Sequence, residues 1–177
     1  MSLTTLAQNP PLSLYVHLPW CVRKCPYCDF NSHTLKNTLP ESDYINKCIQ
    51  DLTIACQSIN ERPLHSIFIG GGTPSLMSAG FYKELLAFVA EHIDITASTE
   101  ITLEANPGTT ESSKFFGYRE AGINRLSVGV QSFQTHQLEN LGSINNRRGA
   151  SVCFKPDPEI FGSEFNFKRA WLCEMVG

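Results

Sequence analysis

The hydrophobic positions of this chain follow two alternating periods. Four short segments alternate apolar and polar residues as a strand does, and three longer segments between them repeat apolar residues at helical spacing. The predicted strands are Leu12–His17, Ser66–Gly70, Glu100–Ala105 and Arg125–Val130. The predicted helices cover about 40–59, 78–92 and 110–120. Strands that alternate with helices predict parallel β–α–β units, so the fold class is α/β, as an open sheet or a barrel.

Local signals set the ends of the predicted helices. Glu41 and Asp43 lie in the first turn of the first helix, where carboxylates interact favourably with the helix dipole. Ser78 is a typical N-cap for the second helix, and Gly122 ends the third. These signals agree with the hydrophobic periods, which strengthens the assignment of all three helices.

Side-chain parity along the strands shows one repeatedly polar face. Ile101 and Leu103 share one face of their strand, and Glu104 lies on the other. In the first strand, Tyr15 and His17 likewise oppose apolar residues. Parallel strands covered on both faces usually read as continuous apolar runs. We therefore expect a wide, partly open barrel whose outer face packs on helices and whose inner face lines a ligand cavity.

Composition and charge narrow the class of protein. A hydrophobic content of 42% is typical of a globular chain with a core, and a net charge of −3 argues against a nucleic-acid partner. No apolar run approaches the ~20 residues of a membrane span, and the N-terminus lacks the pattern of a secretory signal. We expect a cytoplasmic protein. Cys48 and Cys56 occupy apolar helix positions and are expected to act as buried small hydrophobes.

Three further cysteines crowd one short segment. Cys21, Cys25 and Cys28 have the spacing C-x3-C-x2-C, which gathers the thiolates around a common centre. In a reducing compartment such crowding favours a metal over disulfides. Three sulfur ligands on a four-iron cluster leave one iron open for chemistry. The alternative is structural zinc, with His17 or His33 as the fourth ligand.

Polar or glycine features follow the end of each predicted strand. They are the cysteine segment, Gly71-Gly72-Thr73, Glu104 and Gln131. In parallel α/β barrels the carboxyl ends of the strands build the site. Glycines let backbone N–H groups approach a ligand closely, a buried Glu can bind an ammonium or ribose hydroxyls, and a Gln both donates and accepts. The pattern predicts one site at this end of the fold.

These residues carry a family resemblance. The matching motifs are the cysteine segment with Tyr15 six residues before Cys21, Ile69-Gly-Gly-Gly-Thr-Pro-Ser75, Glu104-Ala-Asn-Pro-Gly108, and Gly122-Ile-Asn-Arg-Leu-Ser-Val-Gly-Val-Gln-Ser-Phe133. Together they resemble the radical S-adenosylmethionine (SAM) superfamily, and within it the oxygen-independent coproporphyrinogen III oxidase-like group. The resemblance covers about Leu12 to Leu141. It implies the first four β–α units of a TIM-like (β/α) barrel.

The resemblance also implies cofactors and their ligands. The three cysteines would hold a [4Fe–4S] cluster, and SAM would chelate its open iron. By position, the SAM contacts would be Tyr15, Gly71, Gly72, Thr73, Glu104 and Gln131. A reductant such as flavodoxin or ferredoxin would supply the electron that active members use to cleave SAM.

One position separates two branches of this group. The oxidases carry a further cysteine two residues after the third ligand, and here that position is Phe30. In lacking that cysteine, the chain resembles the heme chaperone branch, whose members bind heme and deliver it to a recipient protein. A coproporphyrinogen III dehydrogenase-type enzyme that acts on a porphyrin ligand is the alternative.

The resemblance ends soon after Leu141. After the pair that corresponds to Leu141-Gly142, members of the family have an Arg that pairs with the SAM carboxylate. Here Ser143 occupies that position. We therefore divide the chain into a tail (1–11), a radical SAM core (12–142) and an unassigned, divergent segment (143–177). The missing later barrel strands suggest a truncated chain. We expect an exposed strand edge, poor stability and weak activity or an inactive fragment.

Overall fold

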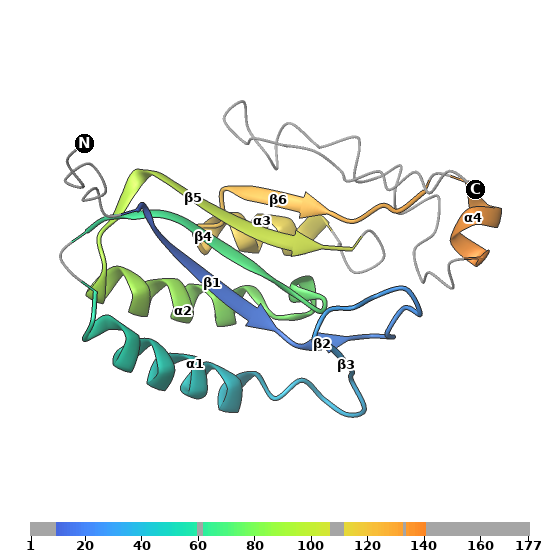
Figure 1. Ribbon diagram of the computed structural model, residues 1–177, viewed down its shortest axis with the longest axis horizontal. Helices are drawn as coiled ribbons and strands as arrows, with labels where there is room; N and C mark the ends of the chain where they lie inside the picture. The colour runs from blue at the N-terminus through green and yellow to red at the C-terminus, as the bar shows by residue number, and fades with distance from the viewer. Residues whose placement is uncertain (1–9, 60–61, 107–111, 133, 141–177) are drawn as a thin grey trace, which may run out of the picture.

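The centre of the molecule is a four-stranded parallel sheet with the order β1-β4-β5-β6 (Figure 1). The computed structural model describes residues 10–59, 62–106, 112–132 and 134–140. The strands of this sheet are β1 (Leu12–Leu18), β4 (Leu64–Gly71), β5 (Ile95–Ala105) and β6 (Arg125–Val128). The helices are α1 (Glu41–Cys56), α2 (Ala79–His92), α3 (Ser112–Glu120) and α4 (Thr135–Asn140).

The predicted order of strands and helices is confirmed, with changes at the ends of elements. β5 begins five residues earlier than expected, since the first residue of β4, Leu64, pairs with Ile95. β6 ends at Val128, shortly before Gln131 takes a left-handed backbone conformation with φ 58°. Three short elements were not predicted: β2 (Trp20–Cys21), β3 (His33–Thr34) and the 3₁₀ helix η2 (Pro74–Leu76). The helix α4 was also missed.

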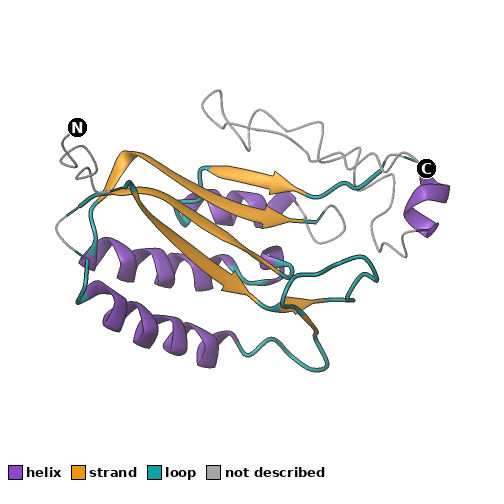
Figure 2. Ribbon diagram, viewed as in Figure 1, coloured by secondary structure: helices purple, strands orange, loops and turns teal. Residues whose placement is uncertain are grey.

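Three helices cover one face of the sheet. Figure 2 shows α1, α2 and α3 together on that face, and α2 packs between the other two. The strand side chains that point toward these helices are buried and apolar, as parity predicted: Val16, Leu18, Ile67, Ile69, Ile101, Leu103, Leu126 and Val128. Each such side chain contributes roughly 1.5–3 kcal/mol through burial. This layer holds the strand ends in fixed positions.

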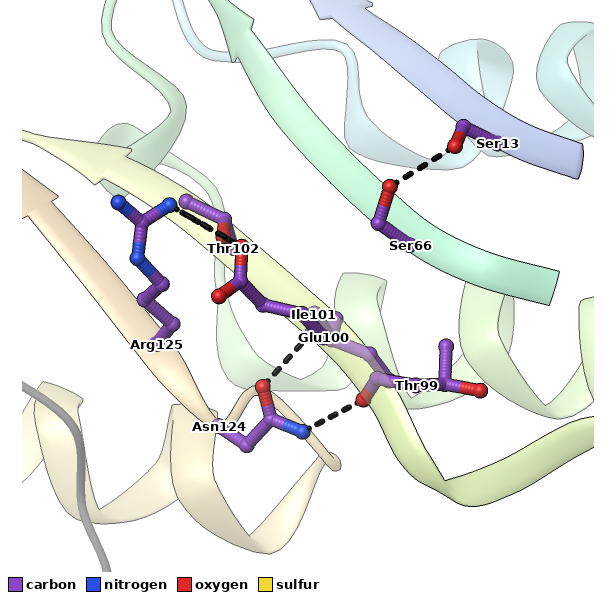
Figure 3. Close-up of polar contacts among 8 residues, drawn as sticks. All are labelled: Ser13, Ser66, Thr99, Glu100, Ile101, Thr102, Asn124 and Arg125. Atoms are coloured by element: carbon purple, nitrogen blue, oxygen red, sulfur yellow. Dashed lines mark hydrogen bonds and ion pairs between the residues drawn. The ribbon is translucent and has the colours of Figure 1, made fainter. Parts of the chain in front are cut away.

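The opposite face is polar, and no described helix covers it (Figure 2). Ser66 donates a hydrogen bond to Ser13 at 2.9 Å across β4 and β1. Arg125 on β6 donates to Glu100 at 3.2 Å and to Thr102 at 3.1 Å on β5 (Figure 3). Side chains that would line the interior of a barrel therefore already pair with one another within the sheet.

A carboxylate joins the starts of two helices. Ser78 caps α2, because its hydroxyl accepts a hydrogen bond from the Phe81 amide at 3.2 Å. Glu41, in the first turn of α1, accepts bonds from the Ser78 amide at 2.7 Å and the Ser78 hydroxyl at 2.6 Å. The cap predicted from sequence is therefore confirmed, and it also ties α1 to α2.

Among the described residues, β1 and β6 form the edges of the main sheet. The helices described here include none with the length and apolar character needed to cross a membrane. Thr110, residues 1–9 of the predicted tail (1–11) and the predicted divergent segment (143–177), with Ser143, lie outside the described residues. The predicted boundary at residue 142 therefore stays a prediction.

Candidate cofactor site

A cavity of about 280 Å³ opens at the carboxyl ends of the parallel strands. Its walls come from the cysteine segment, the glycine turn after β4, the end of β5 and the segment after β6. Eight of the nine site residues predicted from sequence line it: Cys21, Cys25, Cys28, Gly71, Gly72, Thr73, Glu104 and Gln131. Residues from four separate segments thus meet in one place, as the strand-end argument predicted.

The cysteine segment is a loop closed by a small second sheet. β2 and β3 pair in parallel, so Cys21 stands beside Thr34, and the Leu35 amide donates to the Cys21 carbonyl at 2.8 Å. The Cys28 amide donates to the Cys25 carbonyl at 3.1 Å, which makes a tight turn between these two cysteines. Cys21 is buried, and the other two thiols are half-buried at the cavity wall.

The glycine turn is bonded to the backbone just before the cysteine segment. The Gly72 amide donates to the Leu18 carbonyl at 2.6 Å, and the Thr73 amide donates to the Trp20 carbonyl at 2.7 Å. Gly71 has φ +116°, a conformation that favours glycine. A Cβ at Gly72 would stand 2.6 Å from the Trp20 carbonyl oxygen. The two segments can therefore approach this closely only without side chains on the turn.

Glu104 is a partly buried carboxylate in the cavity wall. Its Oε2 accepts a hydrogen bond from the Gly71 amide at 3.3 Å. Desolvation raises the pKa of Glu104, and the Gly71 hydrogen bond lowers it, with desolvation the larger effect. A carboxylate held this way is suited to accept hydrogen bonds from a ligand's hydroxyl or ammonium group.

Tyr15 is the predicted site residue that does not line the cavity. Its ring stacks on Phe68 with centroids 6.2 Å apart, and its hydroxyl lies 3.0 Å from Nδ1 of His17. His17 is in turn 2.7 Å from the Asn31 carbonyl through Nε2, so it bridges β1 and the cysteine loop. Desolvation, followed by the Glu104 charge, raises the pKa of Tyr15. Tyr15 therefore lies near the site, on the polar face of the sheet.

Asn106 lies in the cavity wall but was not among the residues predicted from sequence. It lines the cavity, and its amide nitrogen donates to the Thr73 hydroxyl at 3.3 Å. A signal was present, because Asn106 lies two residues after Glu104 and so has the same parity. Arg23 and Phe30 of the cysteine loop also line the cavity.

The residues present fit an iron–sulfur cluster with a polar ligand beside it. Three thiols, the preferred ligands of such clusters, share one cavity with the Glu104 carboxylate and with the backbone of the glycine turn, whose three amides donate to Glu104, Leu18 and Trp20. Among the described side chains, no three from His, Cys, Asp and Glu are grouped closely enough to ligate a single metal ion. The same three thiols would ligate zinc or a cluster, so this finding does not separate the two metal groups.

Comparison with known proteins places this architecture in a family. The family model described as the Radical SAM superfamily matches residues 15–151. The chain belongs to this superfamily, which confirms the resemblance based on the motifs. Membership implies a [4Fe–4S] cluster and SAM as cofactors.

Individual relatives point to one branch. The heme chaperone HemW of Haemophilus influenzae is 57% identical over 141 residues, 77% of this chain and 37% of that protein. HemW of Escherichia coli is 50% identical over 150 residues, 85% of this chain and 40% of that protein. The chain thus spans about two fifths of the length of these curated relatives.

A solved structure confirms the predicted fold class. The structure titled "Coproporphyrinogen III oxidase (HemN) from Escherichia coli is a Radical SAM enzyme" matches with a TM-score of 0.73 and 27% identity. The match covers 80% of this chain and 33% of that chain. The parallel sheet and its helices are therefore the corresponding part of a radical SAM barrel.

Proposed function

We propose that this chain holds a [4Fe–4S] cluster on Cys21, Cys25 and Cys28 and binds SAM beside it. We also propose that it acts on heme, as the name of its relatives, heme chaperones, indicates. The observation that carries the proposal is the single cavity that joins the three thiols to the glycine turn and Glu104. When bound, the reduced cluster supplies an electron to the SAM sulfonium. The protein's part is to place the ligands and to limit access of water.

The residues of the chain divide this task between them. The thiols of the loop would hold iron, and the Gly71-Gly72-Thr73 backbone would lie along SAM. Glu104 and Gln131 would bind the polar groups of SAM, because one accepts and the other both donates and accepts hydrogen bonds. Tyr15 would support this end of the sheet through His17, which it contacts at 3.0 Å. A reductant such as flavodoxin or ferredoxin would deliver electrons from the cytoplasm.

The heme chaperone role is favoured over an oxidase role. The HemW proteins of Haemophilus influenzae and Escherichia coli match at 57% and 50% identity, whereas the HemN structure matches at 27%. Phe30 also stands where the oxidases carry a further cysteine, and it is 58% exposed at the cavity wall. The proposed ligand is heme, and the proposed partner is a heme-recipient protein.

Anaerobic reconstitution with iron and sulfide tests the cofactor proposal. The expected result is visible absorption from a cluster, about four irons per chain, and saturable SAM binding by equilibrium dialysis. A colourless protein that retains zinc instead of iron would overturn it. Hemin titration then tests the ligand. A chain that binds SAM but shows no saturable heme absorbance change would refute the heme role and leave the cofactor proposal standing.

Release of 5′-deoxyadenosine coupled to decarboxylation of a porphyrinogen would favour the oxidase alternative. We expect the chain neither to decarboxylate a porphyrinogen nor to release 5′-deoxyadenosine coupled to that reaction. The assay is informative only with the reconstituted protein, because both activities need the cluster.

A further inference from the structure

Two buried tyrosine hydroxyls hold the turn that follows the glycine segment. The Tyr82 hydroxyl, from α2, donates to the Pro74 carbonyl at 2.6 Å. The Tyr118 hydroxyl, from α3, lies 2.9 Å from the Ser75 carbonyl and 2.8 Å from the Met77 carbonyl. Both rings are essentially inaccessible, at 0% and 1% exposure. Two helices thus reach the same short piece of backbone.

The turn makes few hydrogen bonds of its own. Within and around η2, the Leu76 amide donates to the Thr73 carbonyl and the Met77 amide donates to the Pro74 carbonyl, both at 3.0 Å. Such a short 3₁₀ helix leaves carbonyl lone pairs for side chains: Tyr82 adds a second donor to the Pro74 carbonyl, and Lys114 Nζ also lies 3.4 Å from the Ser75 carbonyl. A buried tyrosine hydroxyl that lost its carbonyl acceptor would be costly, so the two tyrosines restrict where this backbone can lie.

The restricted backbone is continuous with the cavity wall. Thr73 lines the cavity, and its carbonyl accepts the first hydrogen bond of the turn. A shift of the turn would therefore move the backbone of Gly72 and Thr73. Tyr82 and Tyr118 do not line the cavity themselves, so any effect on a ligand passes through the turn.

The tyrosines are themselves fixed in place. Their rings meet edge to face, with centroids 5.5 Å apart and an interplanar angle of 82°. Burial raises the pKa of both hydroxyls, and the nearby Glu41 charge adds to this effect. The hydroxyls therefore keep their protons and remain hydrogen-bond donors at any physiological pH.

We infer that Tyr82 and Tyr118 are positioning residues that fix the Gly71-Gly72-Thr73 backbone for SAM. This inference rests on the proposed function, because it assumes that the glycine turn contacts SAM. It assigns a positioning role to two side chains that belong to the helix layer and do not line the cavity.

The test compares Tyr118→Phe and Tyr82→Phe with Thr99→Val in the reconstituted chain. Each variant removes one hydroxyl and nearly preserves shape. Thr99 is the matched control, because its buried hydroxyl also donates to a carbonyl, that of Leu64 at 2.7 Å, at the opposite end of the sheet. SAM dissociation constants, iron content and thermal unfolding are measured for all three variants and for the unmodified chain.

We expect both Phe variants to keep their iron and to bind SAM about fivefold more weakly, as fits the loss of one hydrogen bond. Thr99→Val should lose at least as much thermal stability, because the Thr99 hydroxyl also accepts from the Thr96 amide at 3.0 Å, and it should bind SAM normally. Hydrogen exchange provides a second measurement, and the Leu76 and Met77 amides should exchange faster only in the Phe variants. This change would support the inference even where a Phe variant is too unstable for dialysis.

Unchanged SAM affinity and unchanged exchange in both Phe variants would overturn the inference. An equal loss of affinity in Thr99→Val would also overturn it, because general destabilisation would then explain the effect. Failure of the unmodified chain to bind SAM is a different outcome: it would refute the proposed function itself and the inference with it.

Discussion

Glu104 and Gly71 are joined by a hydrogen bond from the Gly71 amide to Oε2 of Glu104, 3.3 Å long. A Cβ at the preceding Gly70 would stand 2.8 Å from that same oxygen. The carboxylate therefore occupies space that only glycine leaves open. This contact connects the end of β5 to the end of β4 and brings a charge to the cavity wall.

The buried carboxylate predicts a pH-dependent stability. The pKa of Glu104 is raised above its ordinary value of 4.5, chiefly by desolvation, so the folded chain holds this proton more tightly than the unfolded chain. The contribution of Glu104 is fully present below pH 4.5 and is lost as the pH rises through the folded pKa. Glu104→Gln, which never ionises, should therefore be more stable than the unmodified chain at neutral pH.

Urea denaturation between pH 4 and 7, without cofactors, measures this effect. Glu84→Gln is the control, since Glu84 is an exposed carboxylate on α2. We expect the difference between Glu104→Gln and the unmodified chain to shrink toward pH 4. A difference that is constant with pH would show that the carboxylate of Glu104 does not titrate differently on folding. SAM affinity should fall in the same variant, because an anionic acceptor is lost.

The glycine turn predicts opposite outcomes for two Gly→Ala changes. In Gly72→Ala the new Cβ would stand 2.6 Å from the Trp20 carbonyl oxygen, a backbone atom fixed by β2. We expect a loss of roughly 1–3 kcal/mol in the free energy of unfolding. Gly80→Ala places its Cβ 3.6 Å from the Ser78 hydroxyl, an ordinary contact at the start of α2. That change should be neutral or should stabilise by up to about 1 kcal/mol.

Chemical denaturation of both variants, with and without reconstitution, checks the comparison. Gly72→Ala should also lose cluster, because the Trp20 carbonyl that must move lies next to Cys21. Equal stability of the two variants would contradict the close approach described for the turn.

Local patterns in the sequence predicted much of this fold. Period and parity give the alternation of strands and helices, and they correctly place Leu103 toward the helices and Glu104 toward the open face. The Ser78 cap is equally local, because donor and acceptor are three residues apart. The same arguments bring the strand-end residues to one edge, which is why most of the predicted residues line the cavity.

Contacts between distant segments were not predictable in this way. Tyr118 and Ser75 are 43 residues apart, and nothing in either local sequence indicates their hydrogen bond. The pairing of β2 with β3 involves only two residues on each side, too few for a periodic signal. The position of Tyr15 outside the cavity depends on its stacking with Phe68 across two strands. Such features appear only once the sheet is assembled.

The proposed iron ligands and the cysteines outside the cavity should respond differently to substitution by alanine. Cys25→Ala should abolish the visible absorption and remove most of the iron after anaerobic reconstitution. Cys48→Ala should leave both unchanged, because Cys48 lies on α1 and burial raises the pKa of its thiol, which disfavours the thiolate that binds metal. Iron and sulfide analysis of the two variants measures the difference. Full iron content in Cys25→Ala would refute the assignment of that thiol.

The polar contacts of β5 and β6 predict which side chain matters more for stability (Figure 3). Asn124 accepts a hydrogen bond from the Ile101 amide at 2.7 Å and donates to the Thr99 carbonyl at 2.8 Å, so it continues the backbone ladder where β6 begins. Asn124→Ala removes both bonds and should cost about 2 kcal/mol in the free energy of unfolding. Glu100→Ala removes the 3.2 Å ion pair with Arg125, whose carboxylate side is 47% exposed, and should cost less than about 1 kcal/mol.

The stability costs of Glu100→Ala and Asn124→Ala should depend differently on ionic strength. The cost of Glu100→Ala should shrink as the ionic strength rises, because salt screens an exposed ion pair. The cost of Asn124→Ala should not change, since its hydrogen bonds join neutral groups to the backbone. Asn124→Asp keeps the acceptor for the Ile101 amide but loses the donor to Thr99, so its stability should fall between the Ala variant and the unmodified chain. Urea denaturation at low and high salt measures both costs. If Glu100→Ala destabilised the chain more than Asn124→Ala at both ionic strengths, the predicted order of the two costs would be wrong.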